Sequence, residues 1–253
     1  MHFSDLHYGQ LQQNILLPRL KKELFRDLGE LVKEIGTIDV VFFTGDLTFS
    51  GKKDEFDALT VFLEELWNVF RKLDCDPYFI AIPGNHDLFR PDPKDPAVKV
   101  LSKYSEEAET RTEFWSDIQS GNEHYKVINE CIKNFGSWYK NTGIRKPAII
   151  DGLLPGDLAA TVTIEDIVLK VIGLNSAFLE FRNGDYLGKL AIHPCQLNAV
   201  AKGDPIKWVE EADISLLLTH HDPNWYFSES LKCYNEEINS SGTTCAVICM
   251  SHR

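Results

Sequence analysis

Short apolar runs alternate with longer segments of helical periodicity over the first third of the chain. Residues 40–43 and 78–82 are continuous apolar or aromatic runs, which are typical of strands buried on both faces of a parallel sheet. Residues 17–35 and 53–73 carry large apolar side chains three and four positions apart, which predicts amphipathic helices. With a short strand at 2–4, this part of the chain is expected to fold as β-α-β-α-β.

Residues 91–150 break that alternation. Three prolines open the segment, and charged helical patterns follow around 103–118 and 124–140. We expect a helical insertion within the domain. Two placements are open: a cap over the carboxyl edge of the sheet, where it would select substrates, or a structural excursion on the far side.

Strand patterns return in the second half of the chain. Residues 159–164 and 167–172 suit a hairpin that turns at Glu165-Asp166. Further apolar runs at 214–218 and 246–250 predict two more strands.

A single helix is expected over residues 195–211, provided that Pro205 permits it in full. The expected fold is therefore α/β: one domain over residues 1–253, in which a two-layered β-sandwich is flanked by helices and carries the 91–150 insertion. The C-terminal part of this fold looks incomplete, because no strand pattern follows the last apolar run.

Polar motifs follow five of the predicted strands. They are Asp5-Leu6-His7, Gly45-Asp46, Gly84-Asn85-His86-Asp87, His220-His221 and Ser251-His252. Ligands collect at the carboxyl edge of the strands in open α/β sheets. Carboxylate, imidazole and amide groups bind hard and borderline divalent cations. The sequence therefore predicts one two-metal site assembled from five loops.

The motifs resemble those of the calcineurin-like metallophosphoesterase superfamily over nearly the whole chain. The matching residues are Ser4-Asp5-Leu6-His7, Thr44-Gly45-Asp46-Leu47-Thr48, Ile82-Pro83-Gly84-Asn85-His86-Asp87 and Leu218-Thr219-His220-His221. Residues 45–51, followed by an acidic helix, are similar to the cyclic-nucleotide phosphodiesterase branch. The Ser and Thr protein phosphatases of the superfamily carry Asp-Arg-Gly after Gly-Asp and Glu after Asn-His, and this chain has neither.

The resemblance implies a role for each motif residue. Asp46 would bridge two divalent cations, with Asp5 and His7 on the first and Asn85, His220 and His252 on the second. His86 resembles the non-ligand histidine of the family, which points at the phosphate or the leaving oxygen. Asp87 would hydrogen-bond the other ring nitrogen of His86 and fix its tautomer. Imidazole ligands favour manganese, with iron, zinc or nickel as alternatives.

Two assignments, that of the histidine pair and that of two arginines, leave alternatives open. Only one residue of the His220-His221 pair should bind a metal; the position of Pro223 favours His220, and His221 would then support it. Arg90 and Arg182 either contact the phosphate or are ordinary surface charges.

Both ends of the chain depart from the family pattern. The last motif of the family reads Gly-His-x-His, but the chain stops at Ser251-His252-Arg253, and its first strand is short. We expect a fragment of a longer protein with further domains. The alternative is a natural member with an impaired first metal site, because the missing histidine would bind the first metal.

The composition limits the classes of binding partner and indicates the cellular compartment. The formal net charge of -12 argues against a surface that grips long nucleic acid, although bound cations would add local positive charge. The given residues show no signal-peptide pattern and no apolar run of membrane length. Its six cysteines form no Cys-x-x-Cys pair, so free thiols in the cytoplasm are expected.

These observations predict a cytoplasmic hydrolase, a dinuclear metal-dependent phosphodiesterase. It would cleave a phosphodiester of a nucleotide or nucleic acid, as a nuclease does, with metal-activated water. Two alternatives remain: a phosphomonoesterase, and a catalytically weakened sensor or effector domain of a larger protein.

Overall fold

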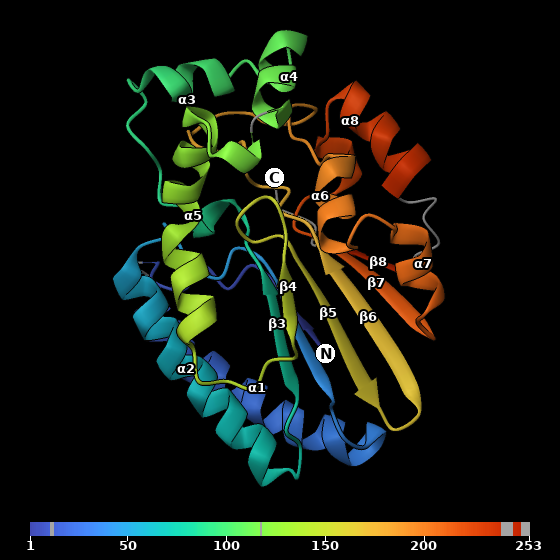
Figure 1. Cartoon of the computed structure of the whole chain (residues 1–253). Coiled ribbons are helices and arrows are strands. Elements are labelled where there is room, and N and C mark those ends of the chain that lie inside the picture. Colours follow the sequence, from blue (N-terminus) through green and yellow to red (C-terminus); the bar gives the residue numbers. More distant parts are fainter. Residues whose placement is uncertain (11–12, 117, 239–244, 249–253) are drawn as a thin grey trace.

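The computed structural model describes residues 1–253 except 11–12, 117, 239–244 and 249–253, and its strands form two sheets (Figure 1). The first sheet is parallel, in the order β1 (His2–Phe3), β2 (Val40–Thr44) and β3 (Tyr78–Ile82). The second is mixed, in the order β4 (Ile149–Asp151), β5 (Leu158–Ile164), β6 (Ile167–Gly173), β7 (Ile214–Thr219) and β8 (Cys245–Ile248). The strands from β6 to β8 run parallel.

An apolar layer holds the two sheets face to face. Val40 and Phe42 of β2 share a buried cluster with Val171 of β6 and Leu218 of β7. The alternate β2 residues, such as Phe43, belong to a second cluster with the helices. Both faces of β2 are thus buried, which explains its unbroken apolar run. The predicted two-layered sandwich is confirmed.

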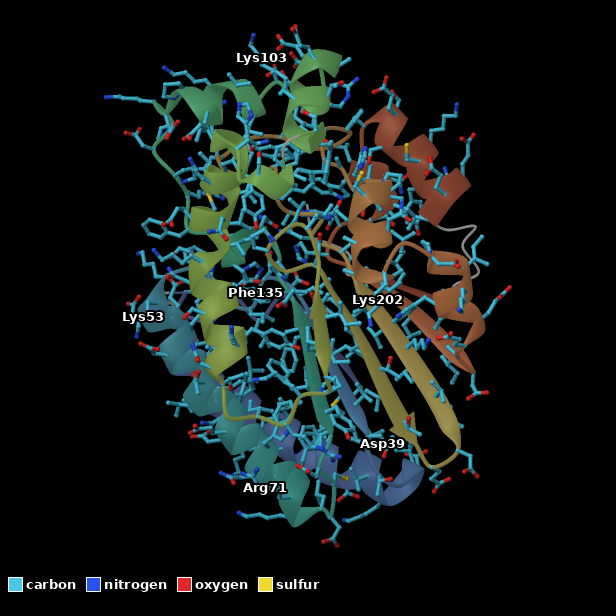
Figure 2. The ribbon with its side chains drawn as sticks, viewed as in Figure 1. Asp39, Lys53, Arg71, Lys103, Phe135 and Lys202 are labelled. Carbon is cyan, nitrogen blue, oxygen red and sulfur yellow. The ribbon has the colours of Figure 1, made fainter. Side chains whose placement is uncertain are left out.

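Three helices cover the outer face of the first sheet. They are α1 (Gln13–Ile35), α2 (Lys53–Lys72) and α5 (Glu123–Asn141). Trp67 of α2 and Phe135 of α5 lie in one buried cluster with Phe79 of β3. Figure 2 shows Phe135 in the interior, whereas Lys53 and Lys103 project outward. The apolar stripes of these helices therefore form half of the core.

Shorter helices pack against the other face of the second sheet and at its end (Figure 1). They are α3 (Pro96–Leu101), α4 (Ala108–Ser116), α6 (Pro194–Val200), α7 (Pro205–Glu210) and α8 (Ser228–Cys233). Single turns occupy Asn85–Asp87, Ile118–Ser120 and Pro223–Trp225, and a π-helix occupies Tyr234–Ile238. Leu101, Phe114 and Leu197 from these helices pack with Ile172 of β6.

Residues 91–150 form α3, α4 and α5 rather than an isolated lobe. Figure 1 shows α3 and α4 at the end of the molecule toward which β3 and β6 point. Ile128 in α5 packs with α3 and α4, while Phe135 and Trp138 of the same helix pack against the first sheet. The segment therefore lies at the motif-bearing end and also completes the core.

The expected single helix over 195–211 is wrong. The chain leaves α6 through Lys202 and Gly203, which have φ of 55° and 86°. The side chain of Asp204 then accepts a hydrogen bond from the Lys207 amide, and Pro205 is the first residue of α7. Pro205 lacks the N–H that a continuing helix needs, but it suits the first turn of a new one.

The predicted hairpin is confirmed. Ile164 pairs with Ile167, so Glu165-Asp166 forms a two-residue turn in which Glu165 has a φ of 53°. None of the described helices is long and apolar enough to cross a membrane. Among the cysteines with described side chains, Cys75 and Cys131 are buried free thiols, and Cys195 and Cys233 are half-buried free thiols.

Candidate metal centre

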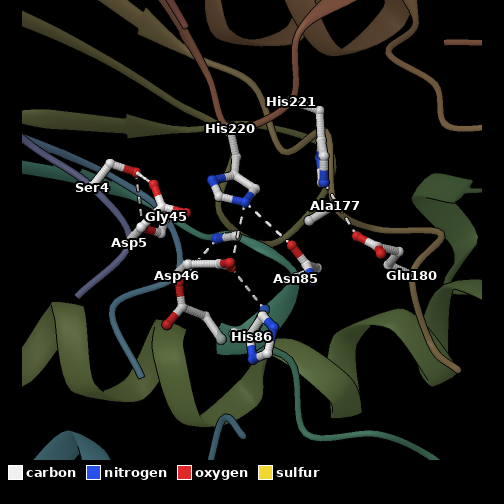
Figure 3. Close-up of polar contacts among 12 residues, drawn as sticks. Ser4, Asp5, Gly45, Asp46, Asn85, His86, Ala177, Glu180, His220 and His221 are labelled. Carbon is white, nitrogen blue, oxygen red and sulfur yellow. Dashed lines mark hydrogen bonds and ion pairs between the residues drawn. The ribbon is translucent and has the colours of Figure 1, made fainter. Parts of the chain in front are cut away.

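The loops after β1 and β2 lie side by side because the parallel pairing of these strands continues into them. The amide of Asp5 donates to the Gly45 carbonyl at 3.2 Å, and the amide of His7 donates to the Asp46 carbonyl at 2.9 Å. A bridge between Tyr8 and Thr48 extends the pairing further. Two motifs distant in sequence thus share one backbone framework (Figure 3).

Three of the motif residues have left-handed backbone conformations. Asp5, His7 and Asp46 have φ of 56°, 45° and 54°. They make up half of the six non-glycine residues with positive φ in the described chain. Such conformations cost on the order of 1–3 kcal/mol each and persist only where the surrounding structure enforces them. These strained conformations therefore lower the stability of the fold while they orient the three side chains.

Two glycines allow the loops to approach one another. A Cβ on Gly45 would lie 2.5 Å from Nδ1 of His220 and 2.6 Å from the amide nitrogen of Gly84. A Cβ on Gly84 would overlap Oδ1 of Asp46. Only glycine leaves room for the carboxylate and the imidazole at this distance.

Asp46 lies at the centre of the cluster and is only 3% exposed. Its Oδ2 is 3.8 Å from Nε2 of His7, and its Oδ1 is 3.4 Å from Nε2 of His220. The amide of His86 donates to Oδ1 at 2.9 Å. Burial raises the pKa of Asp46, but the neighbouring His220 and the contacts from His86 outweigh burial and hold that pKa below its usual value. Asp46 is therefore an anion flanked by two imidazoles.

The buried side of Asp46 presents oriented lone pairs. Nδ1 of His220 lies 2.8 Å from the Thr44 carbonyl, which accepts only, so Nδ1 carries the ring proton. Nε2 then directs a lone pair toward two oxygens, Oδ1 of Asp46 at 3.4 Å and Oδ1 of Asn85 at 3.2 Å. Three lone-pair atoms that converge in this way, without a proton between them, suit the coordination of a cation.

The other side of Asp46 is more exposed. Nε2 of His7 lies 3.9 Å from Oδ1 of Asp5, and the rings of His7 and His86 meet edge to face with centroids 4.6 Å apart. Burial lowers the pKa of His7, which favours the neutral ring that binds metals. Its Nδ1 is buried without a hydrogen-bond partner.

The ligand atoms fall into two groups that share Asp46. His7, Asp46 and His86 form one group, and Asp5, Asp46 and His220 form the other, with ligand atoms within 4.8 Å of one another. Carboxylate, amide and imidazole donors at this spacing fit two divalent cations. His86 lies within ligand reach, although the resemblance to the family implies a different role for it.

The expected hydrogen bond between Asp87 and His86 is wrong. Nδ1 of His86 donates to the Phe49 carbonyl at 2.7 Å. Asp87 is fully buried and accepts from the amides of Leu47, Thr48 and Gly84 at 3.2, 2.9 and 2.9 Å. Burial and then the charge of Asp46 raise the pKa of Asp87 to about 6. Asp87 thus ties together the two loops that carry Asp46 and His86, and its oxygens are turned away from the imidazole.

His221 is turned away from the cluster. Its Nδ1 lies 3.1 Å from Oγ of Ser176, and its Nε2 lies 3.1 Å from Oε2 of Glu180 (Figure 3). Burial lowers the pKa of His221. The structure therefore brings His220 to Asp46 and places His221 behind it.

Several site residues escaped the sequence analysis. The carbonyls of Thr44 and Phe49 orient the two histidines, and Glu180 and Ser176 hold a third. A backbone carbonyl has no sequence signal, and Glu180 stands in no motif. His252 lies outside the described residues. Arg90 lines a cavity that includes His86, whereas Arg182 lines a neighbouring cavity with Tyr104 and Asp185.

Comparison with known proteins gives one family. A family profile described as calcineurin-like phosphoesterase matches residues 1–252. No curated protein matches the chain.

Proposed function

Because the chain belongs to the calcineurin-like phosphoesterase family, we propose that it is a dinuclear metal-dependent phosphodiesterase. The proposed substrate is a phosphodiester of a nucleotide. The observation that carries the proposal is the position of Asp46, which is buried, anionic and common to both ligand groups. A carboxylate shared between two cations is the central element of a two-metal site.

Two divalent cations, when bound, would withdraw charge from the phosphate oxygens and lower the pKa of an attacking water. The protein would bind them through Asp5, His7, Asp46 and His220, with the Asn85 amide oxygen as a further ligand. Asn85 is neutral, so it would leave the cations more electrophilic than another carboxylate would. The imidazole donors favour manganese, iron, nickel or zinc over magnesium, which prefers an all-oxygen shell.

His86 is the proposed proton donor to the leaving oxygen. Its Nδ1 proton is held by the Phe49 carbonyl, so Nε2 is the nitrogen that can exchange a proton with the substrate. The amide of the same residue is anchored on Oδ1 of Asp46 at 2.9 Å. Asp46 would thus hold His86 close to any cations that it binds.

A cytoplasmic location is part of the proposal. It is supported by the free thiols at all four cysteines whose side chains are described, which suit a reducing compartment. Fractionation of cells that express the chain tests it.

The direct test compares bis-p-nitrophenyl phosphate with p-nitrophenyl phosphate, with bound metal measured in the same samples. We expect manganese-supported hydrolysis of the diester at a higher kcat/KM than of the monoester, and none in excess EDTA. A preference for the monoester would identify a phosphomonoesterase. Two bound metals without hydrolysis of either ester would favour a sensor or effector domain.

A further inference from the structure

A cavity of about 360 Å³ opens directly beside the metal centre. Asn85 and His86 of the cluster contribute to its lining, together with Phe49, Phe89 and Arg90. If the phosphate of a substrate lies at Asp46 and His86, one of its ester groups is therefore close enough to enter this cavity. The volume is at the lower end of the about 300–1,000 Å³ typical of small-molecule sites.

Two phenyl rings of the cavity lining are exposed to solvent. Phe49 is 40% exposed and Phe89 is 50% exposed, and among the described residues no other phenylalanine is exposed to this extent. The ring of Phe49 lies 5.6 Å from that of His86, at an interplanar angle of 35°. Two exposed phenyl rings that line one cavity present apolar surface to water, and a bound ligand would cover it.

The backbones that carry these rings are held in place. The amide of Phe49 donates to the Tyr8 carbonyl at 3.1 Å, and the amide of Phe89 donates to the Cys131 carbonyl at 2.8 Å. Between them, the Gly51 carbonyl accepts from Nδ2 of Asn134 in α5 at 2.8 Å. The rings are therefore presented by fixed loops, so a flat ligand meets a preformed surface.

The cavity also carries positive charge in an acidic protein. Lys52 and Arg90 line it and are exposed, although the chain has a formal net charge of -12. Aromatic faces together with cations form the surface on which nucleobases stack and phosphates are held.

We propose that this cavity binds the nucleoside portion of the substrate, with the base on Phe49 and Phe89 and with Lys52 and Arg90 near the sugar phosphate. The inference rests on the proposed phosphodiesterase function and narrows its substrate to a small nucleoside-bearing diester. A single nucleoside fits the volume of the cavity, and the acidic surface does not favour a long nucleic-acid strand.

The test uses two diesters that release the same p-nitrophenolate. One is the p-nitrophenyl ester of thymidine 5′-monophosphate, and the other is methyl p-nitrophenyl phosphate, which has no base. We expect Phe89→Ala to lower the ratio of kcat/KM for the nucleoside diester to that for the methyl diester by roughly 5- to 150-fold, the range for stacking one base on an aromatic ring. Phe49→Ala should lower the ratio in the same direction, and Phe89→Trp should retain it.

Ile206→Ala is the matched control, because Ile206 is an apolar side chain exposed to 61% on α7 and does not line the cavity. It should leave the ratio unchanged. A second measurement does not depend on turnover: calorimetric binding of adenosine 5′-monophosphate, compared with ribose 5-phosphate. Phe89→Ala should weaken the binding of the nucleotide more than that of the sugar phosphate.

Three results would overturn the inference. Equal losses on both diesters would mean that the rings do not read the base. Equal binding of the two monophosphates by the unaltered protein would mean the same. A single-stranded oligonucleotide cleaved at a higher kcat/KM than the nucleoside diester, with no loss in Phe89→Ala, would point to a nuclease. If neither diester is cleaved, the proposed function fails, and the nucleotide-binding measurement alone decides the fate of the cavity assignment.

Discussion

The two sides of Asp46 are built differently. On the buried side, His220 has its Nδ1 proton held by the Thr44 carbonyl and its Nε2 directed at Asp46 and Asn85. On the exposed side, His7 has a left-handed backbone, and its Nδ1 has no hydrogen-bond partner. The imidazole of His220 is thus oriented by a hydrogen bond to the backbone, whereas that of His7 stands on a strained backbone.

This difference bears on the affinity for metal. A ligand whose tautomer and orientation are already fixed loses little freedom when it binds an ion, and such outer hydrogen bonds are worth about 10–100-fold in affinity. The buried side is thus expected to bind its ion more tightly than the exposed side. An ion on the exposed side would be held less tightly, because water competes there with the protein ligands for the ion.

The largest expected effect is at the shared residue. Asp46→Ala should abolish metal binding on both sides and lower diester hydrolysis by more than about 10⁴-fold, since the loss of both cations removes the main source of charge stabilisation. Inductively coupled plasma analysis and initial rates measure the two losses. Asp57→Ala, an exposed acidic side chain paired with Lys53, is the control. One retained tight ion in Asp46→Ala would show that the carboxylate does not bridge.

A pair of histidine variants tests the comparison itself. His220→Ala should remove the tighter of two binding phases in a manganese titration, and His7→Ala should remove the weaker one. The reason is the hydrogen bond to the Thr44 carbonyl, which orients the ring of His220 but not that of His7. His124→Ala, outside both ligand groups, should leave both phases intact. The reverse order of losses would mean that orientation by strain is as effective as orientation by hydrogen bonding.

His86→Ala should retain both metals and lower turnover by roughly 10²–10⁴-fold, the usual contribution of a general acid. The residue lies within ligand reach of His7 and Asp46, so the metal content of this variant is the decisive measurement. If one metal is lost along with the activity, His86 is a ligand of the exposed side.

The smallest effect concerns the support of the buried side. Asp157 is fully buried and accepts hydrogen bonds from the amides of Leu154 and Asn175 and from Nε2 of Gln196. Asn175 is followed by Ser176, which contacts His221. Burial raises the pKa of Asp157 to about 7. The folded-state pKa lies above the unfolded value of about 3.9. Protonated Asp157 therefore makes its full contribution to the free energy of unfolding below pH about 3.9. That contribution is lost as the pH rises through about 7.

Urea unfolding at several pH values checks this prediction. The difference in the free energy of unfolding between the unaltered protein and Asp157→Asn should shift in favour of the variant by up to about 4 kcal/mol between pH 4 and 8. Asp166→Asn, in the exposed turn between β5 and β6, should show no such shift. A difference independent of pH would mean that Asp157 is ionised throughout.

The order of elements was readable from the apolar pattern because burial on one or two faces leaves a periodic trace in the sequence. The break between α6 and α7 was not. It depends on local features, namely the left-handed residues Lys202 and Gly203 and the cap by Asp204. In the sequence, Pro205 is compatible with both a kinked helix and a restarted one. Packing against the second sheet selects the restart, with Leu197 of α6 and Trp208 of α7 in the same buried cluster.

The sequence itself determines that carboxylate, imidazole and amide residues follow successive strands. They gather at one place because parallel strands deliver their carboxyl ends to one edge. The position of Pro223 already favoured His220 over His221, and His220 is the one that lies at Asp46. Only the tertiary structure decided that the Phe49 carbonyl rather than Asp87 holds His86. Neighbouring residues carry equivalent chemistry in the sequence. Only the contacts made by distant segments distinguish them, because a backbone carbonyl or a buried amide becomes a partner only after the chain has folded.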